Sequence, residues 1–317
     1  MASFNPAHID DSRWISRRAN LSGKPSSPSE VTLHYLLCPP PAHTDSKGTI
    51  LLIHGYPQTS YQFRHVITPL ADAGYTVVAP DYRGAGQSSH PRDGFEKVQM
   101  ATDLHDLLTK HLGIKGRVHV VGHDIGGMVA HAYASRFSDN TASVTWGECP
   151  LPGTNAYDTF VKEETTGGVW HFVFHWQTDL PEALTSGRER IYIKHFYDRL
   201  CINPTAIAPR DVDHYATMFA QPGAMRSGFD LYRAFHQDAV DNLNWLGDHG
   251  KCKVPSMSLT GSESFLATIA EEQNQQMYEV TTSATVSGSG HWCAEENPTD
   301  FVKQVLAWVG HNRARST

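Results

Sequence analysis

The sequence predicts an α/β protein in which helices cover both faces of a mostly parallel β-sheet. Short apolar runs typical of buried strands alternate with stretches of helical periodicity up to Pro150, and the alternation resumes at Val254. Between these points the chain is rich in aromatic residues and has no clear strand pattern, which indicates an inserted helical segment. We therefore expect a core domain of residues 1–151 and 246–317, with a helical cap domain of residues 152–245 over the carboxyl edge of the sheet.

The expected strands come in chain order. Residues 31–37 follow a polar lead-in and alternate like a half-exposed strand. Residues 49–54 form a continuous apolar run that enters a Gly-Tyr-Pro loop, as buried parallel strands do. Similar runs at 75–79, 118–121, 143–146, 255–259 and 280–286 complete the expected sheet.

Apolar residues at helical spacing predict the helices between these strands. In the core they fall at 97–112 and 126–137, and a C-terminal helix is expected at 298–311. In the cap, helical spacing is found at 182–200 and 210–219.

The composition excludes several classes of protein. The formal charge of −7 and the pI of 6.2 argue against a nucleic-acid partner, because a protein that binds phosphates needs a basic surface. No apolar run approaches the roughly 18 residues that a membrane span requires. The N-terminus lacks the pattern of a signal peptide, and the five cysteines are widely spaced with no C-x-x-C pair. These features favour reduced thiols and a cytoplasmic location.

No sequence pattern indicates a cofactor or a metal. The segment Gly84-Ala85-Gly86 lacks the third glycine and the later acidic residue of a dinucleotide-binding loop. The chain also contains no H-E-x-x-H motif and no Cys/His cluster. We expect an activity that needs neither.

The most informative segment is Val120-Val-Gly-His-Asp-Ile-Gly-Gly127. An apolar strand, a G-x-Asp-x-G turn and an amphipathic helix form the context of a nucleophile elbow, with Asp124 where many hydrolases carry serine. The flanking glycines allow a strained turn that exposes the side chain above the sheet. The alternative is an aspartate that merely caps the helix.

Two further motifs fall where such an elbow needs them. His54-Gly-Tyr-Pro57 follows an expected strand, so Tyr56 and Ile125 are the candidate backbone donors of an oxyanion hole. Gly288-Ser-Gly-His-Trp292 follows the last expected strand and precedes the C-terminal helix. We expect His291 to be the base, since it is framed by glycines at the position that the chain order nucleophile, acid, histidine requires.

Four motifs together resemble the epoxide hydrolases of the α/β-hydrolase fold, over nearly the whole chain. They are His54-Gly-Tyr-Pro57, Asp81-Tyr-Arg-Gly-Ala-Gly-Gln-Ser88, Gly122-His-Asp-Ile-Gly126 and Gly290-His-Trp292. The resemblance implies that Asp124 attacks an epoxide carbon to give an ester, which water activated by His291 then opens to a vicinal diol. The substrates would be a small-molecule epoxide and water, and a homodimer is left open.

The acid that orients His291 has two candidates. Glu148, in Glu-Cys-Pro-Leu-Pro-Gly153, resembles a branch of the family that uses an acid after the sixth strand. Glu263 lies after the seventh strand, but Ser262 and Ser264 occupy the positions where many relatives carry the acid. We prefer Glu148 and keep Glu263 as the alternative. A third interpretation is that both glutamates are surface residues with no part in the site.

The cap is expected to donate hydrogen bonds to the epoxide oxygen. Tyr232 lies in a segment that resembles the family's second cap tyrosine motif, and a tyrosine is protonated at neutral pH. His171 lies in a Trp-His segment that resembles a branch with histidine in place of the first tyrosine, although it also fits a packing role. Four further residues are candidates to line the substrate pocket: Trp170, His175, Trp176 and Trp292.

Two rival functions share this scaffold. Haloacetate and haloalkane dehalogenases also carry an aspartate at the elbow, but they follow it with arginines or a tryptophan that hold a carboxylate or a halide. Here Ile125 and Met128 occupy those positions, and neither can pair with an anion. A non-catalytic ligand-binding protein is the other rival, and a degenerate set of active-site residues would be its mark.

Overall fold

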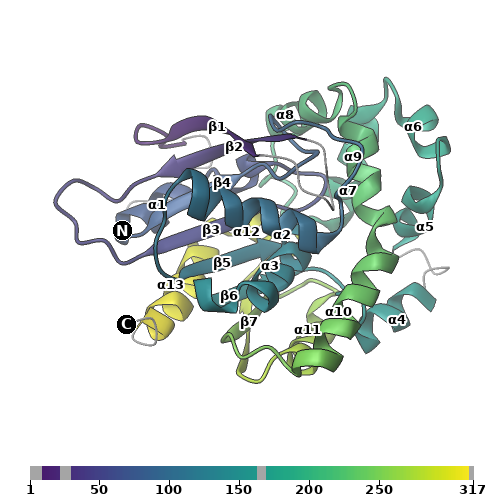
Figure 1. The fold of residues 1–317 in the computed structure, drawn as a ribbon. Coiled ribbons are helices and arrows are strands. Elements are labelled where there is room, and N and C mark those ends of the chain that lie inside the picture. Colours follow the sequence, from purple (N-terminus) through teal and green to yellow (C-terminus); the bar gives the residue numbers. More distant parts are fainter. Residues whose placement is uncertain (1–8, 22–29, 163–168, 314–317) are drawn as a thin grey trace.

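The computed structural model describes residues 9–21, 30–162 and 169–313 of the chain. Their centre is an eight-stranded sheet in the order β1-β2-β4-β3-β5-β6-β7-β8, flanked by helices (Figure 1). The strands are β1 (Ile15–Leu21), β2 (Val31–Cys38), β3 (Thr49–Ile53), β4 (Thr76–Pro80), β5 (Val118–His123), β6 (Thr141–Gly147), β7 (Ser256–Gly261) and β8 (Thr281–Val286). Strand β2 pairs antiparallel with both β1 and β4, and all other neighbours are parallel. The prediction of an α/β fold with a mostly parallel sheet is confirmed.

Both faces of the central strands are buried, which explains their continuous apolar runs. In β3, Leu51 and Ile53 face one hydrophobic cluster, while Ile50 and Leu52 face the other. Successive side chains of a strand point to opposite faces, so a strand covered on both sides needs apolar residues throughout.

Strand β1 was not predicted from the sequence. Ala19 is its one fully buried residue, and most of the others are exposed, so β1 lacks the apolar alternation that identifies a half-buried strand. Its backbone pairs along its whole length with β2, from Ile15 opposite Leu37 to Leu21 opposite Val31. The polar lead-in therefore forms an edge strand through pairing and not through burial of its side chains.

Helices on the core side follow the expected ranges with two differences. The helices are α1 (Ile67–Asp72), α2 (Lys97–Asp106), α3 (Ile125–Arg136), α11 (Ala267–Met277), α12 (Cys293–Glu296) and α13 (Pro298–Arg313), with short 3-10 helices η1 (Ser60–Phe63) and η3 (Ser138–Asn140). The helix expected at 97–112 ends as an α-helix at Asp106 and continues as a π-helical turn, Leu107–His111. Helices α1, α11 and α12 were not predicted.

Seven helices lie between β6 and β7 in the described part of the chain. They are α4 (Asn155–Lys162), α5 (Trp170–Trp176), α6 (Leu180–Thr185), α7 (Glu189–Leu200), α8 (Pro209–Phe219), α9 (Ala224–Arg233) and α10 (Phe235–His249). The expected helix 182–200 is in fact α6 and α7, because Gly187 takes a left-handed φ of 74° between them. Figure 1 shows these helices gathered beyond one end of the sheet.

Buried ion pairs hold these helices on the core. The Lys97 ammonium of α2 bonds to Asp238 of α10 at 2.7 Å and to the Leu231 carbonyl of α9, also at 2.7 Å. Arg64, which follows η1, pairs with Asp211 of α8 at 3.2 Å. The domain boundaries remain a prediction, and the one at residue 245 falls within α10.

No helix in residues 9–21, 30–162 and 169–313 combines the length and the apolar character needed to cross a lipid bilayer.

Candidate active site

Asp124 sits at a strained turn between β5 and α3. Its backbone has φ 55° and ψ −126°, a conformation that side chains rarely adopt. The flanking glycines make the turn fit: a Cβ on Gly122 would lie 2.1 Å from the Gly126 carbonyl oxygen, and one on Gly126 would lie 2.1 Å from the Ile53 carbonyl oxygen. The G-x-Asp-x-G pattern is thus a requirement of close backbone packing.

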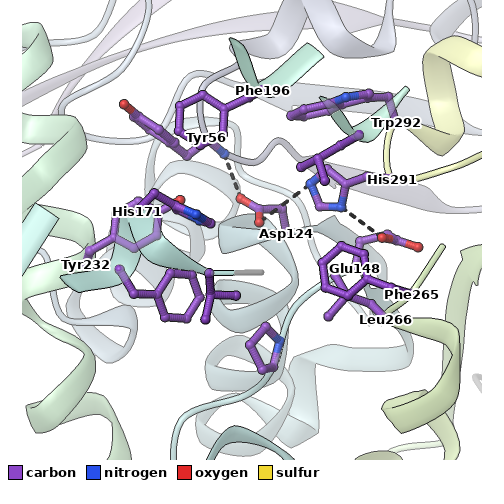
Figure 2. Close-up of a pocket in the computed structure, with 14 residues that line it drawn as sticks. Tyr56, Asp124, Glu148, His171, Phe196, Tyr232, Phe265, Leu266, His291 and Trp292 are labelled. Atoms are coloured by element: carbon purple, nitrogen blue, oxygen red, sulfur yellow. Dashed lines mark hydrogen bonds and ion pairs between the residues drawn. The ribbon is translucent and has the colours of Figure 1, made fainter. Parts of the chain in front are cut away.

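The Asp124 carboxylate faces two different partners (Figure 2). The Tyr56 N–H donates to Oδ1 at 2.9 Å, and His291 Nε2 lies 3.8 Å from Oδ2. The side chain lacks the hydrogen bond that a capping residue accepts from the second or third N–H of a helix, which argues against the capping role. Burial raises the pKa of the Asp124 carboxyl above its ordinary value, although the charge of His291 and the N–H groups of Ile125 and Tyr56 oppose that rise.

His291 is held from its other side by Glu148. Nδ1 of His291 lies 2.8 Å from Glu148 Oε2, and Glu148 is 1% exposed. Glu148 also accepts hydrogen bonds from the Gly261 N–H and the Ser264 hydroxyl, both at 2.8 Å. Glu263 is exposed and bonds to the neighbouring Ser262 hydroxyl. The geometry therefore brings Glu148, and not Glu263, to the histidine.

The electrostatic surroundings raise the pKa of His291. Burial alone would lower it, but the hydrogen bond and charge of Glu148 and the charges of Asp124 and Glu296 outweigh burial and favour the imidazolium. His291 can therefore hold a proton taken from water between two carboxylates.

Two hydrogen-bond donors lie on the opposite side of Asp124. His171 of α5 and Tyr232 of α9 line the same cavity, with ring centroids 5.6 Å apart. Figure 2 shows both across Asp124 from His291. Burial raises the pKa of Tyr232 well above its ordinary value and lowers the pKa of His171 to about 3. At neutral pH both are therefore uncharged groups that can each donate a hydrogen.

The cavity around these groups is mainly apolar. Beyond the residues already named, it is lined by Pro150, Val169, Phe172, Phe196, Leu200, Phe265, Leu266 and Trp292. Of the four pocket residues expected from sequence, Trp292 is among them. Phe196 and Leu200 are four residues apart within a predicted helix, so a helical-face analysis could have found these two. Phe172 is next to the candidate His171 in the sequence, but adjacent residues do not share a helical face.

Three expected pocket residues lie outside this cavity. His175 is one turn beyond His171 on α5, where it bonds to the Tyr192 hydroxyl at 2.5 Å and packs against the Tyr232 ring at 4.3 Å. Trp176 donates to the Tyr232 carbonyl at 2.9 Å. Trp170 packs parallel to the Phe196 ring at 6.4 Å. They support the lining residues from behind. His175 shares a helical face with His171 but lies one turn further along α5, beyond the cavity.

The described residues contain no group of three or more His, Cys, Asp or Glu side chains that could hold a metal ion.

Residues 48–298 match the sequence model of the alpha/beta hydrolase fold family. This chain belongs to that family. The hydrolase is 34% identical over 261 residues to the soluble epoxide hydrolase of Corynebacterium sp. (strain C12), covering 81% of this chain and 88% of that relative. It also resembles the solved structure of epoxide hydrolase CorEH, with a TM-score of 0.80 and 28% identity over 94% of this chain and 99% of that one. The fluoroacetate dehalogenase of Burkholderia sp. is 28% identical over 286 residues, 85% of this chain and 89% of that relative.

The family resemblance inferred from the four motifs is thus confirmed. In this alpha/beta hydrolase the two carboxylates, Asp124 and Glu148, follow the adjacent strands β5 and β6, and His291 reaches them from the loop after β8. The arrangement combines a carboxylate at a strained turn, a histidine in contact with a second carboxylate, and two neutral hydrogen-bond donors across a cavity.

Proposed function

We propose that this hydrolase converts an epoxide and water to a vicinal diol through a covalent ester on Asp124. The observation that carries the proposal is the carboxylate at the elbow, bound through Oδ1 to the Tyr56 N–H with His291 on one side and a donor pair on the other. An alcohol at this position would form an ether that water does not cleave, whereas a carboxylate forms an ester that it does. The similarity to named epoxide hydrolases supports the same substrate class.

In the first step, Oδ2 of Asp124 attacks a ring carbon and the C–O bond of the epoxide breaks. Tyr232 and His171 donate hydrogen bonds to the departing oxygen, and Tyr232 gives it a proton as the ring opens, which leaves Tyr232 as a tyrosinate. Both donors belong to the segment 152–245, and we propose that this segment acts as the cap of the active site. Positioning in the cavity and ring strain supply much of the driving force.

In the second step, water attacks the carbonyl carbon of the ester. His291 takes the proton of that water through Nε2, while Glu148 stabilises the imidazolium through Nδ1. The N–H groups of Tyr56 and Ile125 stabilise the oxyanion that forms at Oδ1. As the tetrahedral intermediate collapses, the imidazolium of His291 protonates the departing diol oxygen, and the second proton of the water returns to Tyr232. The carboxylate of Asp124 is restored, so the cycle needs no cofactor.

A single turnover in ¹⁸O-water tests this route. One heavy oxygen should enter the carboxylate of Asp124, and the first diol released should carry an oxygen from the protein. Label that enters the diol directly, with none in the Asp124 peptide, would refute the covalent route.

The substrate class is tested against the two rivals with styrene oxide and bromoacetate. We expect the diol from styrene oxide and no bromide release from bromoacetate. Ile125 and Met128 are apolar and buried, so neither can hold the carboxylate of a haloacid. Bromide release faster than diol formation would favour a dehalogenase, and no reaction with either would favour a ligand-binding protein.

A further inference from the structure

The carboxylate of Glu296 is buried, and the proposed reaction does not use it. Glu296 ends the short helix α12, five residues after His291. Its Oε1 accepts the N–H groups of Gly290 and Trp292, each at 3.1 Å. Its Oε2 accepts the N–H groups of Ile202 at 2.7 Å and Asn203 at 2.9 Å. One side chain thus receives four backbone hydrogen bonds.

These four donors come from two segments that are distant in sequence. Gly290 and Trp292 flank His291, whereas Ile202 and Asn203 follow α7. A direct bond joins the same two segments, since the His291 N–H donates to the Leu200 carbonyl at 3.1 Å. The loop that carries the proposed base is therefore attached to the end of α7.

Both of the joined segments contribute side chains to the cavity. Phe196 and Leu200 of α7 line the cavity, as do His291 and Trp292. Their contact is tight, because a Cβ on Gly290 would lie 2.6 Å from the Leu200 carbonyl oxygen. A movement of the end of α7 would therefore be transmitted to His291.

Glutamate suits this position because an ionised carboxylate only accepts hydrogen bonds. Bonds from N–H groups to a charged acceptor are about twice as strong as those between neutral groups. A glutamine would present its NH₂ group to one of the two N–H pairs, which would leave two donors facing two donors.

We propose that Glu296 is a positioning residue that holds His291 in line with Asp124 and couples it to the cavity-lining end of α7. The inference rests on the proposed function, because it assigns His291 to the hydrolysis of the ester. Glu296 would then affect the second step of the reaction and leave the attack of Asp124 largely unchanged.

The charges that face His291 give a second measurable consequence. Asp124, Glu148 and Glu296 are its acidic neighbours, and each favours the imidazolium. His123 packs against it at 4.8 Å and His171 lines the same cavity, but burial lowers the pKa of both, so they are neutral near pH 7. Removing the charge of Glu296 should lower the pKa of His291, and the acid limb of ester hydrolysis should then move to lower pH.

The experiment is a single turnover of styrene oxide by Glu296→Gln, with the esterified Asp124 peptide and the diol measured against time and pH. We expect ester hydrolysis to slow by about ten- to a hundredfold, the range in which a misplacement of about 1 Å acts. Ester formation should change by less than about threefold. Glu279→Gln, the same change at an exposed glutamate, should leave both steps at the wild-type rate.

If the role of Glu296 were purely structural, the variant would contain less folded enzyme, and the amplitude of ester and diol formation would fall. The rate constants of both steps and the acid limb of ester hydrolysis would stay unchanged. That result, or an equal slowing of both steps, overturns the inference. If Glu296→Gln does not fold, Glu296→Asp keeps the charge and shortens the reach, so its hydrolysis should slow with an unshifted acid limb. Wild-type turnover without an ester on Asp124 would instead refute the proposed function.

Discussion

Replacing Glu148 by glutamine removes the acceptor that fixes the proton of His291 on Nδ1. The Gly261 N–H donates to Oε1 and the Ser264 hydroxyl to Oε2, so the glutamine amide cannot rotate freely. With its oxygen on Gly261, its NH₂ faces Nδ1 and forces the proton of His291 onto Nε2. With its oxygen on His291, its NH₂ meets the Gly261 N–H. Either orientation removes an interaction that the base needs.

The expected slowing of ester hydrolysis follows from the tautomer that His291 would adopt in this variant. An imidazole protonated on Nε2 cannot accept a proton from water there, and forcing this tautomer in a Ser-His-Asp protease lowers the rate by about 10⁴-fold. We expect Glu148→Gln to slow ester hydrolysis by about 10³- to 10⁴-fold, or roughly 4 to 5.5 kcal/mol in activation free energy. The residual acid limb should move to lower pH, because the hydrogen bond and charge of Glu148 raise the pKa of His291.

The assay follows the Asp124 peptide by mass after rapid mixing with styrene oxide. Glu148→Gln should accumulate the ester, whereas the control, Glu263→Gln, should release diol within about twofold of the wild-type rate because its carboxylate is exposed. A larger defect in Glu263→Gln than in Glu148→Gln would refute the reasoning and move the acid to the later loop.

Three further predictions concern the other groups. His291→Gln should form the ester and hold it, detected as an Asp124 peptide of raised mass; rapid full turnover would contradict the assigned base. Tyr232→Phe and His171→Phe should each slow ester formation by about ten- to a hundredfold in stopped-flow measurements and leave hydrolysis of the ester unchanged. The pKa of Asp81 is about 2: burial raises it, but hydrogen bonds and histidine charges outweigh burial. Its contribution of about 2–3 kcal/mol to the free energy of unfolding is therefore present above pH 4 and lost as the pH falls towards 2. Acid denaturation of Asp81→Asn should lack this dependence.

Sequence reasoning succeeded where the local pattern and the tertiary environment agree. Strand β3 is buried at every position and apolar from Ile50 to Ile53, between two hydrophobic layers, and its run was recognised directly. Strand β1 has an exposed face and depends on its partner β2, so no pattern within it could identify it. The break at Gly187 was missed because helical spacing continues on both sides of it.

The same difference between local pattern and tertiary packing decides which parts of the candidate site could be predicted. Asp124 and His291 could be singled out as candidates because each has neighbouring glycines that close backbone contacts require. The choice between Glu148 and Glu263 stayed open because β6 and β7 are neighbours and their loops leave the sheet side by side. The apolar lining depends on how α5, α7 and α9 pack, which a single sequence does not encode locally, and His175 was therefore placed one helical turn too close.

Both proposed catalytic carboxylates stand on backbone that glycine would occupy more comfortably, with φ of 55° at Asp124 and 59° at Glu148. Each such conformation costs a residue with a side chain roughly 1–2 kcal/mol. At Asp124, where burial also disfavours the charge, thermal stability and turnover therefore favour different residues. A library screened for thermal survival without substrate should enrich glycine there, yielding sturdier but inert descendants. At Glu148 the buried hydrogen bonds that the carboxylate accepts outweigh the strain and should retain it.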